Sequence, residues 1–293
     1  MLYLKHLLNR LRLKIMEPAS LLIISLLFIV QLSFSQDNPV NVMPYPKKVD
    51  FGTGKFRITS QSGINLLGVS GDTILEEAAN NLLRKLNFTT LSYFMQEKVK
   101  LNDQFSDASI FIQVNEKEEN PVNVDESYKL SVNQEKVQLI ARTTIGALRG
   151  METLLQLVMA DSAGYYFPAV EIDDEPRFKW RGMMVDVARH FIPPDILKRN
   201  IDAMSKVKMN VLHLHLSDDE GFRVESKVFP RLHQSGSNNQ YYTQSELREI
   251  IDYAAAKGIM VYPEFDLPGH CTSWLAGYPE LASGPGPYEP GPR

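Results

Sequence analysis

Cysteine is almost absent from this sequence of 293 residues, and its scarcity excludes a small fold held together by disulfides. Cys271 is the only thiol, so no internal disulfide can form. It directly follows His270, but no Cys–His–acid pattern surrounds it that would activate a nucleophile. We therefore expect Cys271 to be a small packed side chain.

The sequence also lacks an excess of positive charge. It holds 31 Lys and Arg residues against 35 Asp and Glu residues, a formal net charge of −4. Domains that bind nucleic acid usually carry a basic stripe, so we expect no nucleic-acid partner. The 44% hydrophobic and 23% charged content is that of an ordinary globular protein with ample material for a core. The slight acidity is compatible with a neutral or weakly polar substrate.

The first 35 residues differ from the rest of the chain. Four basic residues precede an apolar run over 21–30, and Ser33 and Ser35 then supply small side chains. This order is typical of a secretory signal peptide over residues 1–35. A membrane anchor is the alternative, but the run is short against the roughly 20 residues that span a bilayer. We expect an exported protein, periplasmic or extracellular, with no stable membrane anchor after cleavage and with 27 basic and 34 acidic residues.

Residues 36–175 predict a smaller α+β domain that contains no histidine and only scattered acids. Strand-like alternation covers residues 54–58, 63–67, 109–113, 127–131, 136–141 and 165–172, and helical spacing covers 73–86 and 144–159. Thr144 is the expected N-cap of the second helix. This order favours an antiparallel or mixed sheet covered by two helices, with a scaffolding or interface role.

From residue 176 onward, short apolar runs end in polar residues three times. The runs cover residues 182–187, 211–216 and 259–262, and helical segments lie between them. One of these helices opens at Thr243 with a capping box that includes Glu246, and it is expected to run to Lys257 and stop at Gly258. Strands that alternate with helices predict βαβ units, and polar residues at each strand end favour a (β/α)8 barrel.

The predicted barrel is incomplete within this sequence. Only 117 residues follow Pro176, against about 250 in a typical barrel. We therefore expect residues 176–293 to hold about three βα units, and the sequence to be the N-terminal part of a longer protein.

The candidate site residues follow the three predicted strands. Arg189 comes after the first strand, where its guanidinium suits paired hydrogen bonds to hydroxyls or a carboxylate. A structural ion pair with Asp186 is the alternative. Asp218 lies in the acidic group 218–220 after the second strand, which could also be a solvated turn; Glu264, Asp266 and His270 follow the third. A histidine near carboxylates is held in one orientation and can orient a reacting group.

His213 and His215 form a His-x-His pair on the second predicted strand. In amidohydrolase barrels such a pair lies on the first strand and binds a catalytic divalent metal. The neighbouring leucines at 212, 214 and 216 are typical barrel filler. We expect both histidines to pack in or beside the barrel core and to find hydrogen-bond partners there. A metal-dependent barrel hydrolase that uses them stays open as an alternative.

Three segments together resemble the β-N-acetylhexosaminidases of glycoside hydrolase family 20. They are Trp-Arg-Gly-Met-Met-Val-Asp-Val-Ala-Arg-His-Phe at 180–191, Asn-Val-Leu-His-Leu-His-Leu-Ser-Asp-Asp at 210–219 and Pro-Glu-Phe-Asp-Leu-Pro-Gly-His at 263–270. Their order and spacing extend the resemblance over roughly Pro39 to Arg293. The predicted domain at 36–175 also resembles the usual companion domain of this family.

The resemblance implies removal of terminal N-acetylglucosamine or N-acetylgalactosamine from glycans, with retention and without a metal or other cofactor. In this family the acetamido oxygen of the substrate attacks the anomeric carbon, an exception to the two-carboxylate scheme. By motif position, Arg189 would hold sugar hydroxyls. Asp218 and His270 would pair near the catalytic acid, and Glu264 and Asp266 would support this rim.

One part of the family pattern is missing. The catalytic glutamic acid and its aspartate partner belong to a His-x-Gly-Gly-Asp-Glu motif after the fourth strand, and this sequence contains neither Gly-Asp-Glu nor Gly-Gly-Asp. We therefore expect residues 1–293 alone to be inactive. A non-catalytic sugar-binding relative that retains Arg189 is the second alternative.

Overall fold

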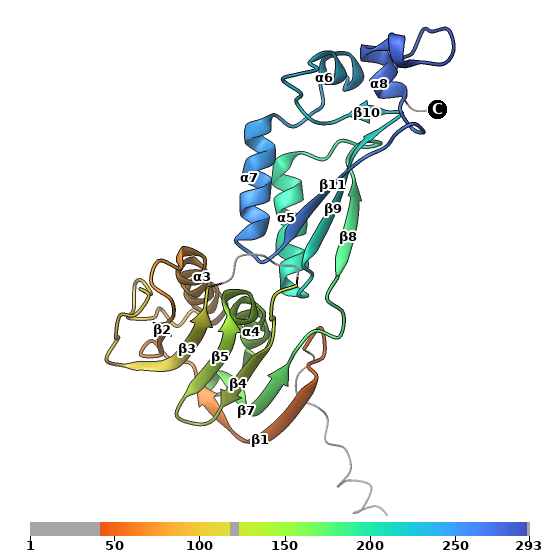
Figure 1. Ribbon diagram of the computed structural model, residues 1–293. Helices are drawn as coiled ribbons and strands as arrows, with labels where there is room; N and C mark the ends of the chain where they lie inside the picture. The colour runs from red at the N-terminus through yellow and green to blue at the C-terminus, as the bar shows by residue number, and fades with distance from the viewer. Residues whose placement is uncertain (1–41, 118–122, 292–293) are drawn as a thin grey trace, which may run out of the picture. The chain divides into compact units, whose positions relative to one another are not determined.

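A computed structural model describes residues 42–117 and 123–291, which form two sheets with their helices (Figure 1). The predicted signal peptide at 1–35 lies outside the described residues. Within the described part, no helix combines the length and apolar character needed to cross a membrane. The first sheet ends with β7 at Asp174, and the second begins with β8 at Gly182.

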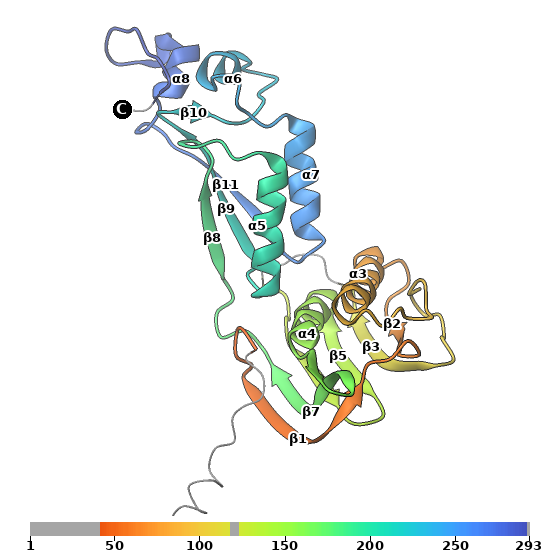
Figure 2. The same ribbon diagram turned by 180° about the vertical axis from the view of Figure 1, so that it is seen from behind.

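The first sheet is mixed, as the sequence predicts, and has two helices on one face (Figure 2). Its strand order is β1-β7-β4-β5-β3-β2, with β6 paired to β7, and β2, β3 and β5 run parallel. The elements are β1 (Lys48–Arg57), β2 (Gly63–Leu67), α3 (Thr73–Thr90), β3 (Ala108–Glu116), β4 (Tyr128–Val132), β5 (Val137–Thr143), α4 (Thr144–Gln156), β6 (Met159–Asp161) and β7 (Gly164–Asp174).

Helix α4 starts at Thr144 as predicted, but the predictions of its N-cap and of its C-terminal end were wrong. The N-cap is Thr143, whose hydroxyl accepts a hydrogen bond from the backbone N–H of Gly146, so the cap lies one residue before the expected position. The helix ends at Gln156, and Met159 instead starts the short strand β6. Asp161 at the end of β6 forms ion pairs with Lys55 and Arg57 of β1, contacts that local helical spacing does not encode.

The second sheet consists of three parallel strands and one short antiparallel strand. β9 pairs with β8 on one side and with β11 on the other, while β10 pairs antiparallel with the end of β9. The elements are β8 (Gly182–Asp186), α5 (Pro194–Lys206), β9 (Val211–Asp218), β10 (Gly221–Phe222), α6 (Arg231–Gly236), α7 (Gln244–Ala255), β11 (Met260–Phe265), α8 (Thr272–Gly277) and a 3-10 turn at Pro279–Leu281. β8–α5, β9–α7 and β11–α8 are the expected βα units.

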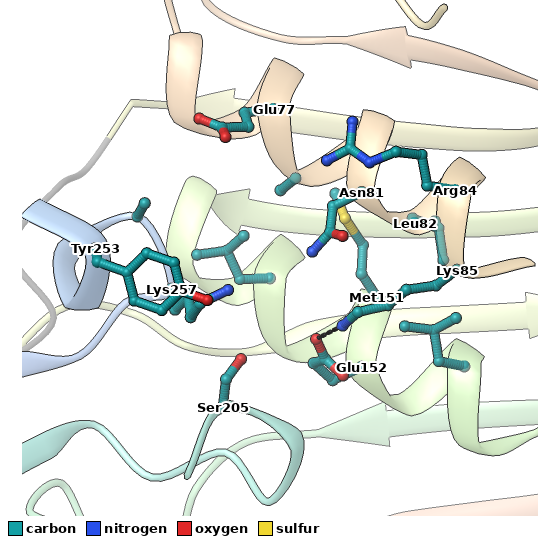
Figure 3. Close-up of a pocket in the computed structure, with 14 residues that line it drawn as sticks. Glu77, Asn81, Leu82, Arg84, Lys85, Met151, Glu152, Ser205, Tyr253 and Lys257 are labelled. Atoms are coloured by element: carbon teal, nitrogen blue, oxygen red, sulfur yellow. Dashed lines mark hydrogen bonds and ion pairs between the residues drawn. The ribbon is translucent and has the colours of Figure 1, made fainter. Parts of the chain in front are cut away.

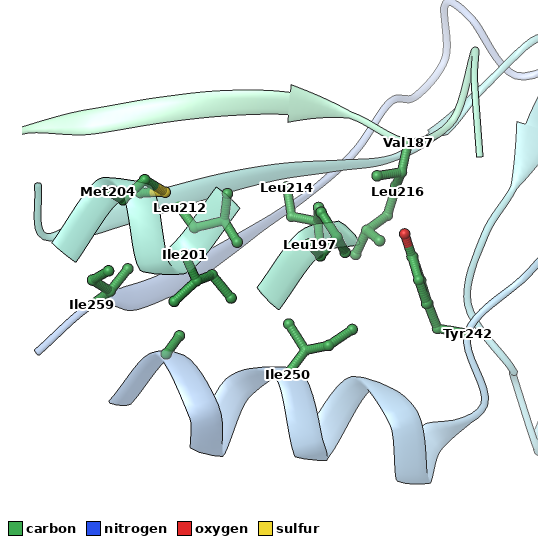
Figure 4. Close-up of a cluster of buried hydrophobic side chains, with 11 residues drawn as sticks. Val187, Leu197, Ile201, Met204, Leu212, Leu214, Leu216, Tyr242, Ile250 and Ile259 are labelled. Atoms are coloured by element: carbon green, nitrogen blue, oxygen red, sulfur yellow. The ribbon is translucent and has the colours of Figure 1, made fainter. Parts of the chain in front are cut away.

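The core of this second sheet lies between the strands and helices α5 and α7 (Figure 4). Leu212, Leu214 and Leu216 point toward these helices and are at most 1% exposed. They therefore pack between the sheet and the helices and do not fill a barrel interior. This corrects the prediction that these leucines are barrel filler. Full burial of one such side chain contributes roughly 1.5–3 kcal/mol. Because side chains alternate along a strand, His213 and His215 take the opposite face.

Helix α7 has the capping box that the sequence predicts. Thr243 accepts a hydrogen bond from the backbone N–H of Glu246, and the Glu246 carboxylate accepts one from the backbone N–H of Thr243. The helix ends at Ala255, two residues earlier than expected, and the chain turns into β11 at Gly258. Gly258 has a φ of +66°, a conformation that glycine adopts without steric cost.

A buried ionic cluster ties the first sheet to the amino ends of the strands in the second. Glu126 Oε2 accepts hydrogen bonds from Arg149 Nε at 2.7 Å and from Arg181 Nη2 at 2.5 Å. The Arg149 guanidinium also donates to the backbone carbonyls of Lys257 and Gly258, directly before β11. Only 3% of the Glu126 and Arg149 side chains is exposed, so the pair is shielded from water.

Lys208, in the turn between α5 and β9, makes a second buried link. Its ammonium donates hydrogen bonds of 2.8 Å to the Tyr128 hydroxyl and to Asp174. Burial raises the pKa of Tyr128, and the adjacent Asp174 carboxylate adds to this effect. The φ of Lys208 is +59°, where glycine or asparagine is usual, so the turn keeps a long side chain at a strained backbone position.

Candidate active site

Three acidic or imidazole side chains lie in one row across the parallel strands of the second sheet. His215 of β9 is in register with Asp186 of β8 and with Glu264 of β11. Residues in register on adjacent strands share a face, so these three side chains converge near the carboxyl ends of the strands. This is the end where (β/α)8 barrels build their active sites.

His215 bridges two carboxylates. Its Nδ1 is 2.7 Å from Glu264 Oε2, and its Nε2 is 3.0 Å from Asp218 Oδ2. The ring is only 3% exposed. Burial alone would lower the pKa of His215, but the hydrogen bonds to Asp218 and Glu264 outweigh burial and raise it. The structure therefore favours a protonated His215, a role that sequence reasoning did not assign.

Asp218 is the most heavily contacted carboxylate at the carboxyl ends of the strands, and its side chain is buried. Besides His215, it receives Arg189 Nη2 at 2.5 Å, and its Oδ1 accepts a hydrogen bond of 2.6 Å from the backbone N–H of Asp219. His270 Nδ1 lies 3.3 Å from the same Oδ1. The structure thus brings together Arg189, Asp218 and His270, which the sequence places after three different strands.

Arg189 makes the ion pair with Asp186 that the sequence left open as an alternative, and it also contacts a second carboxylate. Its guanidinium forms an ion pair of 2.7 Å with Asp186 as well as the contact with Asp218. Burial would raise the pKa of Asp186, but hydrogen bonds from the backbone and guanidinium of Arg189 outweigh burial and lower it. About half of the Arg189 side chain is exposed, which leaves donors available at the surface of the site.

Arg223 holds the loop that leads to Arg189, a role that the sequence did not predict. The buried guanidinium donates hydrogen bonds to the backbone carbonyls of Val187 and Ala188, directly before Arg189. It also donates to the carbonyls of Ser237 and Gln240, so it joins the loop after β8 to the long connection after β10. Burial lowers the pKa of Arg223. A lone arginine in a loop gives no local signal of such a role.

The remaining predicted residues lie at the end of β11. The Asp266 backbone N–H donates to the Ser217 hydroxyl at 3.1 Å, which joins the ends of β11 and β9. His270 is exposed and has a φ of +55°, an unusual backbone conformation for a residue other than glycine. We call Asp186, Arg189, His215, Asp218, Glu264 and His270 the strand-end cluster.

Two sets within this region have donor atoms close enough for one metal ion. One is His215, Asp218 and Asp266; the other is Asp218, Asp219 and His270. Among the described residues, His213 belongs to neither set, although its Nε2 lies 3.0 Å from Glu264 Oε2 without forming an aligned hydrogen bond. A metal-binding histidine is neutral, whereas the contacts of His215 favour protonation. These contacts are those of an ion-pair network.

Besides His213 Nε2, two further polar atoms close in sequence to the cluster are buried without a hydrogen-bond partner among the described residues. They are Oε2 of Glu220, just after β9, and Nε1 of Trp274 in α8. The Trp274 ring packs edge-on against Phe222 of β10, with 5.1 Å between ring centroids. Buried polar atoms are usually satisfied, so these two are available to a ligand or to water.

A separate cleft is lined by α3, α4 and the carboxyl ends of α5 and α7 (Figure 3). Ser205, Tyr253 and Lys257 line it, and the segments that follow them lead into the amino ends of β9 and β11. Lys85 and Glu152 form an ion pair of 2.8 Å across part of it. The cleft therefore belongs to the opposite end of the strands from the strand-end cluster.

Comparisons with known proteins match both parts of the chain to one family. Residues 178–290 match the family model described as glycosyl hydrolase family 20, catalytic domain, and residues 42–157 match one described as beta-acetyl hexosaminidase like. Together these matches cover most of the described chain and every strand of both sheets except β6 and β7. The chain thus resembles glycosyl hydrolase family 20 over most of its described length.

Several family 20 relatives align with most of this chain. Beta-hexosaminidase subunit A2 of Dictyostelium discoideum is 36% identical over 89% of this chain and 48% of its own length. Beta-hexosaminidase of Vibrio furnissii is 35% identical over 82% of this chain and 40% of its own length. The chain thus spans about half the length or less of these relatives.

Solved family 20 structures share the fold. Flavobacterium johnsoniae chitobiase is 42% identical, with a TM-score of 0.80 over 84% of this chain and 37% of that one. Streptomyces plicatus N-acetyl-beta-hexosaminidase, solved in complex with Thio-NAglucal, is 32% identical, with a TM-score of 0.74 over 86% of this chain and 51% of that one. These similarities confirm the predicted fold class: an α+β domain followed by the first part of a (β/α)8 barrel.

Proposed function

We propose that this chain supplies part of the active site of a β-N-acetylhexosaminidase, which removes terminal N-acetylglucosamine or N-acetylgalactosamine from glycans. The observation that carries this proposal is the strand-end cluster itself. The half-exposed guanidinium of Arg189 lies at the edge of the cluster and forms an ion pair with the buried carboxylate of Asp218. Its free donors suit the vicinal hydroxyls of a terminal sugar.

Within this proposal the cluster binds and orients the substrate. Arg189 donates paired hydrogen bonds to sugar hydroxyls. Asp218 and His270, 3.3 Å apart, lie beside the reacting centre and help orient the catalytic acid. Glu264 and Asp266 support them at the end of β11. The acetamido group of the substrate acts as the nucleophile, so the chain itself need not supply one.

The general acid of this scheme belongs to a Gly-Asp-Glu motif that the sequence does not contain. We therefore propose that residues 1–293 alone do not turn over substrate. Purified protein of this length should release no nitrophenol from 4-nitrophenyl N-acetyl-β-D-glucosaminide. Saturable release by it would contradict this point.

The complete translated product of the gene tests the activity itself. It should hydrolyse 4-nitrophenyl N-acetyl-β-D-glucosaminide but not the matching β-glucoside, which lacks the acetamido group. Arg189→Lys should lower kcat/KM by about tenfold or more, because hydrogen bonds to charged groups contribute roughly 1.5–3 kcal/mol. A product that binds N-acetylglucosamine without hydrolysis would instead favour a non-catalytic sugar-binding protein.

Export is a further part of the proposal. It rests on the basic residues, apolar run and small residues within positions 1–35. Expression in a bacterial host followed by N-terminal sequencing of the exported protein should give a mature chain that starts at Gln36. An uncleaved, membrane-bound product would support the alternative of an anchor.

A further inference from the structure

His215 is a buried titratable group without a role in the scheme above. It lies at the centre of the row formed by Asp186, His215 and Glu264, and both of its ring nitrogens contact carboxylate oxygens. An ionised carboxylate can only accept hydrogen bonds, so each ring nitrogen must carry a proton to donate one. With both carboxylates ionised, the two contacts are those of an imidazolium, which is consistent with the raised pKa of His215.

The charges around His215 come from each strand of the parallel sheet and from the loops that follow. They are Asp186 on β8, Arg189 after β8, Asp218 at the end of β9, Glu264 on β11 and Asp266 after β11. Four of these five groups are acids and Arg189 is a cation, and the titratable ring of His213 on β9 also lies 3.0 Å from Glu264 Oε2. A charged His215 thus offsets part of the repulsion that would otherwise separate these carboxylates.

The contacts also form a chain that crosses the sheet. Glu264 holds Nδ1 of His215, and Nε2 of His215 holds Oδ2 of Asp218. The same Oδ2 receives Arg189, while Oδ1 of Asp218 faces His270. Rotation of the Asp218 carboxylate would disturb both sugar-facing groups at once. The hydrogen bond from His215, on the central strand β9, prevents this rotation.

We propose that His215 and Glu264 are positioning residues for sugar binding and hydrolysis, acting through Asp218 to set the directions of Arg189 and His270. This inference rests on the proposed function. It predicts that activity depends on the protonated state of His215, acting through Asp218.

The variant Glu264→Gln tests this chain in the complete gene product. Glutamine keeps the size of the side chain and can still accept one hydrogen bond, but it removes the negative charge beside Nδ1. The matched control is Glu249→Gln, which makes the same change in an ion pair with Lys198 on the surface of α7. Thermal melting of both variants shows whether the fold is retained.

Two readouts separate positioning from a merely structural role. NMR titration of the imidazole carbons should show a lower His215 pKa in Glu264→Gln than in wild type and no change in Glu249→Gln. In Glu264→Gln the alkaline decline of kcat/KM should begin at a lower pH than in wild type. At the alkaline end kcat/KM should fall by about tenfold, as expected for the loss of a charge-assisted hydrogen bond.

Each outcome decides a different point. An alkaline limb that moves together with the His215 pKa supports the proposal. A lower His215 pKa with an unchanged pH profile overturns it while leaving the hexosaminidase function intact. An unchanged His215 pKa also overturns it, because the Glu264 contact would then have no electrostatic effect. A wild-type product without glycosidase activity overturns both this inference and the proposed function.

Discussion

Replacement of Glu126 by glutamine should destabilise the protein more than its single lost charge suggests. Glu126 lies between the guanidinium groups of Arg149 and Arg181, and its other oxygen accepts a hydrogen bond from Asn210 at 3.2 Å. Glutamine has nearly the same size, so the variant creates no cavity. It leaves two cations facing a neutral amide in a site from which water is excluded.

The magnitude follows from the burial of the partners. Removal of one member of a buried ion pair typically costs about 3–5 kcal/mol, because the remaining charge is uncompensated. Arg149 would keep its hydrogen bonds to the carbonyls of Lys257 and Gly258, so we expect the lower end, about 3 kcal/mol. For a chain of this size 1 kcal/mol corresponds to about 2–4 °C, which predicts a fall in Tm of roughly 6–12 °C.

Urea denaturation and thermal melting of Glu126→Gln measure this loss. The control is Glu280→Gln, which removes an equally short ion pair with Arg231 in which both side chains are about half exposed. Exposed pairs contribute little to stability, so the control should melt with the wild type. Equal melting of Glu126→Gln and the control would refute the reasoning that burial makes the Glu126 cluster strong.

Three further predictions concern the second sheet. Leu214→Ala should cost about 2–5 kcal/mol in urea denaturation, because the side chain is fully buried against α5 and α7. Thr243→Ala should cost about 1 kcal/mol in the same assay, because it removes the N-cap of α7, while Thr243→Ser should be near wild type. The raised pKa of His215 should stabilise the fold below the unfolded value of about 6.5, and this stabilisation should be lost as pH rises through the folded pKa. Urea midpoints across this range should therefore fall with pH in wild type and less in Glu264→Gln; equal slopes would contradict it.

The sequence alone determined most of the local structure and the family resemblance. Alternation and helical spacing located the strands 211–218 and 260–265 and the two helices of the first sheet to within a few residues. The capping box at Thr243 was readable because its two partners are three residues apart. The motifs after the strands singled out Arg189, Asp218 and His270, which the structure brings together, because residue types at strand ends are a local property of the chain.

Only the tertiary structure decided which of these residues meet. The pairing of His215 with Glu264 depends on the register of β9 against β11, and register is set by the packing of leucines on the opposite face against α5 and α7. The hydrogen bonds from Arg223 to the loop before Arg189 join positions 35 and 36 residues apart through backbone carbonyls, which carry no sequence signal. A pattern in sequence reports which face a side chain takes, but the distance between two side chains on that face depends on contacts made by the rest of the fold.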